Sequence, residues 1–128
     1  MSRPNRFRWM KALGLVLLGI ALGVALSVAA RWPHWEAVYR SDQPATVAYA
    51  DGSRHLLALV RRSSFVGESH QIFVGRDPSL SYGHWVDIET FAESESVKTT
   101  EWTTSGVRVV FDTGHELFVP ARYFIGGR

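Results

Sequence analysis

The sequence of 128 residues contains no cysteine, which excludes disulfides, thiolate metal sites and thiol redox chemistry. It also lacks closely spaced histidine pairs such as the H-x₃-H typical of zinc sites. The five histidines are His34, His55, His70, His84 and His115. No G-x-S-x-G elbow or other catalytic motif is present. These absences favour a non-catalytic protein that binds no metal and no cofactor.

Long apolar runs are absent apart from residues 12–30. That run has nineteen residues, no charge, and Ser27 as the only polar side chain. A helix needs roughly 20 apolar residues to cross the hydrocarbon core of a bilayer. The sequence therefore predicts a transmembrane helix over residues 12–30, with the lipid bilayer as its partner.

Positive charge is distributed unevenly around this run. Residues 1–11 contain four Lys or Arg residues and no acid. Arg31 and Arg40 follow within a similar distance, together with two acids. Because the side richer in Lys and Arg is normally cytoplasmic, residues 1–11 are predicted to form a cytoplasmic tail. We expect a single-pass protein of the cytoplasmic membrane, with its C-terminal domain extracytoplasmic.

Tryptophans flank the run on both sides, with Trp9 before it and Trp32 and Trp35 after it. Indole rings favour the headgroup region, which supports a retained signal-anchor. A cleaved signal peptide is the alternative, since a basic start and small residues at the end of the run fit that as well. The apolar core of a signal peptide usually spans only about 7–15 residues, however. Both interpretations export the remainder of the chain.

Small residues repeat at four-residue spacing within the run, at Gly19, Gly23 and Ser27. Such a stripe lets two membrane helices approach closely. It identifies a candidate packing surface for a homodimer through the transmembrane helix.

The exported part lacks the excess of positive charge that nucleic-acid binding needs. Residues 31–128 contain ten Lys or Arg residues and twelve acids, a net charge of −2. The net charge of +2 for the whole chain therefore comes from the basic tail. We expect no nucleic-acid partner.

Helical periodicity is absent after residue 44. Short runs rich in Val, Phe, Tyr, Trp and Thr alternate with glycine-bearing turns, which indicates strands and hairpins. We predict a small all-β domain over residues 45–128, an antiparallel barrel or sandwich of 6–7 strands, preceded by a stalk over residues 31–44 in which Pro33 and Pro44 break regular structure. The predicted strands cover residues 46–50, 54–62, 70–75, 84–89, 97–104, 107–111 and 116–119.

Three glycine turns are expected to join neighbouring strands as hairpins, at residues 51–52, 105–106 and 112–114. We assume a three-residue loop at 112–114, with Gly114 in a left-handed conformation, and a two-residue loop at 105–106. These loop lengths set a strand register that places the apolar side chains on one face, as a half-buried sheet requires. The cross-strand pairs predicted by this register are Val107–Val119, Val109–Leu117 and Trp102–Val109.

The most distinctive segment is residues 75–85, GRDPSLSYGHW, in which two turn signals frame an apolar and aromatic tip. Tyr and Trp are favoured contact residues at interfaces. We predict that Leu80 and Tyr82 project from the domain and, with Arg76, bind a partner, while Trp85 anchors the end of the loop in the core. The alternative is that Tyr82 and Trp85 simply cap the core.

The chain end is apolar for a terminus, with the sequence ARYFI over residues 121–125. Because termini fray unless they are docked, we predict that Phe124 and Ile125 pack on the domain.

Two segments, FVGRDPSLSYGHWVDI and ELFVPARYFIGGR, resemble small single-pass bacterial envelope proteins of unknown function. The resemblance covers most of residues 45–128. It implies a single-pass envelope topology, and it implies no activity, cofactor or site.

The expected function is that of a membrane-anchored extracytoplasmic binding or accessory module, non-catalytic, for an envelope partner, either another envelope protein or an envelope component. One alternative is a small-ligand-binding β-barrel carrier at the membrane surface, and another is a cleaved and secreted β-protein. A sizeable apolar cavity would favour the carrier. A solid core with an exposed aromatic loop would favour the binding module.

Overall fold

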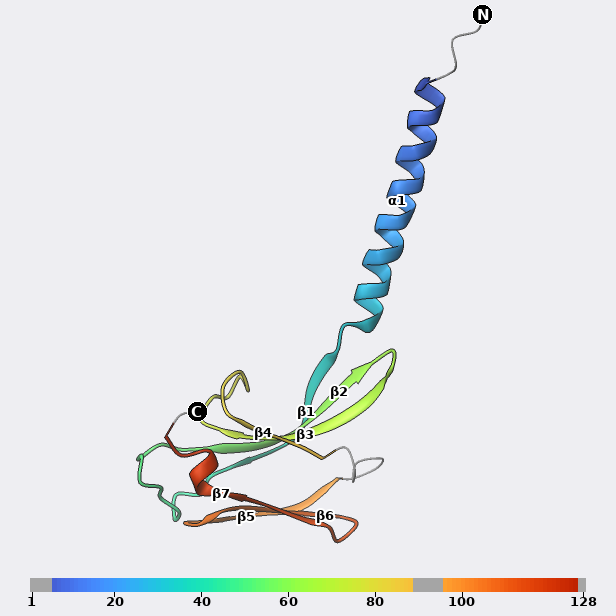
Figure 1. The fold of residues 1–128 in the computed structure, drawn as a ribbon. Helices are drawn as coiled ribbons and strands as arrows, with labels where there is room; N and C mark the ends of the chain where they lie inside the picture. The colour runs from blue at the N-terminus through green and yellow to red at the C-terminus, as the bar shows by residue number, and fades with distance from the viewer. Residues whose placement is uncertain (1–5, 89–95, 127–128) are drawn as a thin grey trace, which may run out of the picture. The chain divides into compact units, whose positions relative to one another are not determined.

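The computed structural model describes residues 6–88 and 96–126 (Figure 1). A single long helix, α1 (Arg6–Arg31), precedes seven antiparallel strands, which confirms the predicted helix followed by a small all-β domain. The strands are β1 (His34–Asp42), β2 (Leu56–Ser64), β3 (Gly67–Gly75), β4 (His84–Asp87), β5 (Val97–Thr103), β6 (Gly106–Phe111) and β7 (Glu116–Pro120), and a short 3₁₀ helix covers Ala121–Tyr123. The chain divides into two compact units, one containing the helix together with residues 64–66 and the other containing the remainder of the strands.

Helix α1 contains the whole apolar run predicted to cross a membrane. It has 26 residues, and none of its side chains is buried. At about 1.5 Å per residue, such a helix exceeds the roughly 30 Å of a hydrocarbon core. By length and composition it can span a membrane or serve as a signal sequence.

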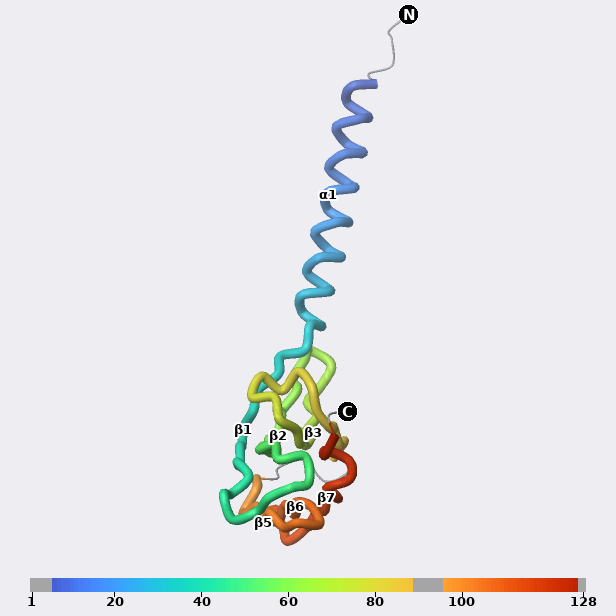
Figure 2. The backbone as a smooth tube through the Cα atoms, turned by 90° about the vertical axis from the view of Figure 1, so that its left-hand side faces the viewer, coloured from blue at the N-terminus to red at the C-terminus, as the bar shows by residue number. Residues whose placement is uncertain are grey.

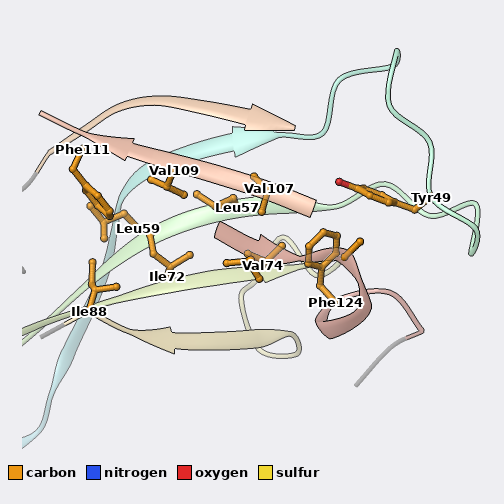
Figure 3. Close-up of a cluster of buried hydrophobic side chains, with 12 residues drawn as sticks. Tyr49, Leu57, Leu59, Ile72, Val74, Ile88, Val107, Val109, Phe111 and Phe124 are labelled. Atoms are coloured by element: carbon orange, nitrogen blue, oxygen red, sulfur yellow. The ribbon is translucent and has the colours of Figure 1, made fainter. Parts of the chain in front are cut away.

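The strands form two open sheets, one in the order β1-β2-β3-β4 and the other in the order β5-β6-β7. Figure 2 shows β1, β2 and β3 side by side. Side chains from both sheets meet in one core, drawn in Figure 3. This core includes Leu57, Leu59, Ile72, Val74, Val107, Val109, Phe111 and Val119. Two open sheets around a shared core make a sandwich rather than a closed barrel.

Strand β2 is buried on both faces. Its first five residues, LLALV, are all buried. Leu57 and Leu59 enter the core between the sheets, while the alternate residues belong to a second apolar cluster, here called the outer cluster. The outer cluster consists of Leu56, Ala58, Val60 and Phe73. A strand with no polar alternation needs cover on both sides, and β2 has it.

The segment predicted as a stalk over residues 31–44 instead contains β1. This strand pairs antiparallel with β2, from His34 opposite Ser63 to Asp42 opposite Leu56. The phenol of Tyr39 also lies 2.8 Å from the Thr100 hydroxyl of β5. The mixed polar and aromatic composition concealed the strand because none of its residues is fully buried, although Tyr39 packs against the core and Ala37 against the outer cluster. The β-domain therefore begins at His34 and not at residue 45.

No strand forms over residues 46–50, so the predicted hairpin at Asp51-Gly52 is wrong, although its turn is present. Gly52 has φ 67°, and its N–H donates to the Tyr49 carbonyl at 3.0 Å. Side-chain bonds replace the missing strand ladder. The Gln43 amide donates to the Val47 carbonyl at 2.7 Å and accepts from the His55 N–H at 2.9 Å. Such local side-chain bonds compete with regular structure.

The β6–β7 hairpin has the predicted register. Gly114 has φ 89°, as a left-handed loop residue should. Val107 lies opposite Val119, and Val109 lies opposite Leu117.

The β5–β6 hairpin differs from the prediction, because Trp102 lies opposite Val107 and not opposite Val109. Gly106 is the first residue of β6 rather than a loop residue. A Cβ atom at Gly106 would lie 2.3 Å from the Val119 carbonyl oxygen. Both this close approach of β7 and the positive φ of 156° therefore require glycine at position 106.

The C-terminal segment docks on the domain as predicted. Phe124 is only 3% exposed, and Ile125 packs against the same core. The Phe124 ring centroid lies 5.3 Å from that of Tyr49, 5.1 Å from that of His55 and 6.3 Å from that of Trp102.

We expect Phe124→Ala to destabilise the protein by about 3–5 kcal/mol, since it removes a buried aromatic ring. Phe118→Ala is the matched control, because Phe118 is 44% exposed. It should cost less than about 1 kcal/mol. Urea unfolding of the full chain in detergent micelles, followed by tryptophan fluorescence, measures both. Equal costs would contradict the docked position of Phe124.

Candidate functional site

An open groove of about 510 Å³ lies on the face of the four-stranded sheet that bears the outer cluster. Its size is within the range of about 300–1,000 Å³ that is usual for ligand sites. Strand β1, the loop before β4 and β4 itself line it. The lining residues are Trp35, Ala37, Arg40, Ser79, Leu80, Ser81 and Trp85.

Aromatic rings form much of the groove surface. The Trp85 ring packs edge-on against Phe73, with centroids 5.0 Å apart, and against Trp35 at 5.7 Å. The Arg62 guanidinium lies over the Trp35 ring, 5.1 Å from its centroid. Trp35 remains 51% exposed, so much of its ring can contact a ligand. Large rigid rings of this kind give contact area at small entropic cost.

The loop between β3 and β4 has an ordered structure built around Asp77. The Asp77 carboxylate accepts hydrogen bonds from the Ser79 hydroxyl at 2.7 Å, the Ser79 N–H at 2.9 Å and the Ser81 N–H at 3.1 Å. These bonds, with the Ser79 side chain contributing most, lower the pKa of Asp77 below its usual value. The Leu80 N–H also donates to the Asp77 carbonyl at 3.0 Å.

Leu80 packs inward and does not project as predicted. Its backbone has φ 62°, a left-handed conformation that costs a non-glycine residue about 1–2 kcal/mol. This conformation turns the side chain onto the outer cluster. Burial of the apolar side chain offsets the backbone strain, so Leu80 is both a cover for the sheet and part of the groove wall.

Two glycines close the base of the loop over Phe73. A Cβ atom at Gly83 would lie 2.4 Å from the Phe73 ring, and one at Gly75 would lie 2.7 Å from it. The two glycines also approach each other, because a Cβ at Gly75 would be 3.0 Å from the Gly83 Cα. Side chains at either position would push the loop off the sheet.

The other predicted site residues occupy different surroundings. Tyr82 is 56% exposed at the end of the loop. Arg76 donates to the Ser53 hydroxyl at 3.0 Å and does not line the groove. Trp85 is half-buried against Phe73 rather than fully inserted in the core.

Sequence reasoning assigned Trp35 to the membrane interface and left Arg40 in the stalk, whereas both lie in β1 and line the groove. Trp35 and Ala37 are two residues apart, and this spacing could have predicted that they lie on the same face of a strand. Arg40 was harder to place, since a register shift between Ala37 and Tyr39 changes which residues share that face. The Arg40 guanidinium donates to the Pro78 carbonyl at 3.0 Å, which leaves further N–H donors for a ligand.

A buried polar network joins β1 to β2 beside the core. His55 is 2% exposed, and its Nδ1 lies 3.0 Å from the Gln43 Oε1, an acceptor, so Nδ1 holds the ring proton. His55 Nε2 then faces Asp51 Oδ2 at 3.5 Å. In the described part of the chain, these two atoms are the buried side-chain polar atoms without a hydrogen bond.

The network shifts the protonation of both ionisable groups. Burial lowers the pKa of His55, and the nearby Asp51 carboxylate only partly opposes this. Burial alone would raise the pKa of Asp51, but the Ser53 N–H and His55 outweigh it and lower that pKa. The network lies in the connection between β1 and β2, and its His55 side chain is fully buried while that of Asp51 is 15% exposed, which suits a structural role.

The small residues of α1 stay available for packing. A Cβ atom at Gly19 or Gly23 would meet nothing within 4 Å. Four-residue spacing places Gly19, Gly23 and Ser27 on one side of the helix. The homodimer contact through this side stays a prediction.

Metal ligands do not gather in the described residues, where no group of three or more His, Asp or Glu side chains could hold an ion. No protein-family model, no curated protein and no solved structure matches the chain. The groove must therefore be interpreted from its own chemistry.

The lowered pKa of His55 predicts a loss of stability in mild acid. Below about pH 6.5, the usual pKa of histidine, His55 binds a proton in the unfolded chain but stays neutral in the folded protein. The free energy of unfolding therefore decreases as the pH is lowered through about 6.5. His55→Asn keeps an N–H donor towards Gln43 but does not titrate. Urea unfolding from pH 7.5 to pH 5 should show a steeper decline for the native protein than for the variant. If the unfolding free energies of the native protein and the variant declined equally with decreasing pH, the lowered pKa of His55 would be contradicted.

Proposed function

We propose that the protein is a membrane-anchored, non-catalytic binding module whose β-domain lies outside the cytoplasm and docks another envelope protein in the groove. The observation that supports this most directly is the groove itself. Its aromatic walls are Trp35 of β1 and Trp85 of β4, and beside them Leu80 belongs to a loop that the Asp77 bonds and the Gly75–Gly83 approach hold in place. A pre-ordered loop avoids the entropy cost of ordering on binding.

The chemistry of the groove favours a peptide segment with an apolar or aromatic side chain beside a carboxylate. Trp35, Leu80 and Trp85 supply apolar contact, and Arg40 supplies N–H donors at the same surface. Arginine and tryptophan are also the residues that most often dominate binding energies at interfaces. This combination supports protein recognition more than binding of a wholly apolar small molecule.

The alternative of a ligand carrier would need space inside the domain. The region between the two sheets is filled by core side chains, several of which have zero exposure (Figure 3). The groove, in contrast, is open to solvent on the outer face. A solid core with an exposed aromatic groove favours the binding module.

Site-specific photocrosslinking in cells tests the groove. With a photoreactive side chain at Ser81, which lines the groove, we expect a discrete adduct with another envelope protein. The same side chain at the exposed Lys98 of β5 should give no such adduct. Trp35→Ala should reduce the Ser81 adduct about tenfold or more, as loss of a hot-spot tryptophan does. Phe118→Ala should leave it unchanged. Identical adducts from both positions, or insensitivity to Trp35→Ala, would refute the proposed site.

The anchor is tested separately by sequencing the N-terminus of the mature protein extracted from membranes. Retention of residues 12–30 is expected, because the apolar run is longer than a signal-peptide core and α1 extends through it. A mature chain that starts at Ala30 or Arg31 would show cleavage and would support the secreted alternative.

A further inference from the structure

The turn between β2 and β3 has two large apolar residues, Phe65 and Val66. They are 84% and 79% exposed, the highest values for large hydrophobic side chains in the described residues. Turns of this size favour Gly, Asn and Asp, whose backbones or side chains suit the bend. Neither the turn nor the core therefore accounts for an apolar pair at this position.

Chain connectivity keeps this turn near the end of α1. Only two residues separate Arg31 at the helix end from His34, the first residue of β1. His34 lies opposite Ser63, and Phe65 follows two residues later. With at most about 3.6 Å per residue and about 5.5 Å between paired strands, the Phe65 Cα lies within about 25 Å of the Arg31 Cα. This bound holds for any angle between the helix and the domain.

The neighbouring charges suit an anionic surface. Arg61 and Arg62 precede the turn at the end of β2 and Arg31 ends α1, while Glu36 and Glu68 are the acids on the neighbouring strands, which leaves a balance of one positive charge. Arg61 pairs with Glu36 at 2.5 Å, while Arg62 is exposed and stacks on Trp35. Basic residues beside exposed apolar side chains are typical of segments that lie in the headgroup region of anionic membranes.

We propose that Phe65 and Val66 insert into the outer leaflet of the membrane that holds α1. The turn then forms a second lipid contact, which limits rotation of the β-domain about the helix end and sets the direction in which the groove faces. The occupant is the bilayer, because the span that precedes β1 brings it within reach of the turn. This inference rests on the proposed anchoring, since a cleaved chain would have no span near the turn.

The absence of cysteine makes the test direct, because one introduced cysteine gives one labelled site. The full chain is reconstituted in vesicles of phosphatidylcholine and phosphatidylglycerol, with an environment-sensitive fluorophore at Val66→Cys. Leu17→Cys in α1 serves as the buried reference and Thr113→Cys, in the β6–β7 loop, as the aqueous reference. We expect the label at 66 to emit at shorter wavelength than at 113 and to be quenched by doxyl-labelled lipid. Its depth should be about 5–10 Å, as for other interfacial apolar groups.

The outcomes distinguish insertion of the turn into the bilayer from an exposed turn, a missing anchor and a contact with another protein. Phe65→Ser in the Val66→Cys chain should shift the label towards the emission seen at 113. A shielded label at 17 with an aqueous label at 66 would overturn the inference and leave the anchor intact. Aqueous labels at both 17 and 66 would overturn the anchor as well. A label at 66 that is aqueous in these vesicles but shielded in native membranes would indicate a protein contact and would also overturn the inference.

Discussion

Strand β2 imposes the main constraint on the β-domain, because its first five residues are all buried and point alternately to opposite faces. A single core between two sheets would cover only Leu57 and Leu59. The other three side chains need a second cover on the outer face, and an exposed patch of that kind would favour association or aggregation. Within the β-domain, Leu80 of the loop before β4, Ala37 of β1 and Trp85 of β4 pack against the outer cluster.

The groove follows from how that cover is built. Leu80 is held in a left-handed conformation so that its side chain reaches the outer cluster, and Trp85 packs over Phe73 beside it. Arg40 fastens the loop to β1 through the Pro78 carbonyl. Strained backbone at a non-glycine residue is found most often where the surrounding structure over-determines it, and such positions cluster at binding surfaces. The same contacts that complete the fold therefore leave an aromatic, partly cationic groove with fixed walls.

Local signals in the sequence were sufficient to predict the apolar helix, the all-β domain, the β6–β7 register and the docking of Phe124. These features depend on run length, glycine turns and alternation within short segments. Features that depend on contacts between distant segments were missed. Strand β1 was taken for a stalk because only its pairing with β2 reveals it. Gly106 was placed in the loop because the close approach of β7 is not visible in the local sequence. Leu80 was expected to project because its φ angle is not visible in composition.

The central claim is that the loop before β4 is a folded cover of the outer cluster and not a freely projecting binding loop. The most direct measurement compares the unfolding free energies of Leu80→Ala and Tyr82→Ala in the full chain. Leu80→Ala keeps the left-handed backbone cost but removes the packing, so it should destabilise the protein by about 1–2 kcal/mol. Tyr82→Ala should change stability by less than about 0.5 kcal/mol, since Tyr82 is 56% exposed. Equal and small effects would contradict the claim, because they would mean that Leu80 contributes no cover to the sheet.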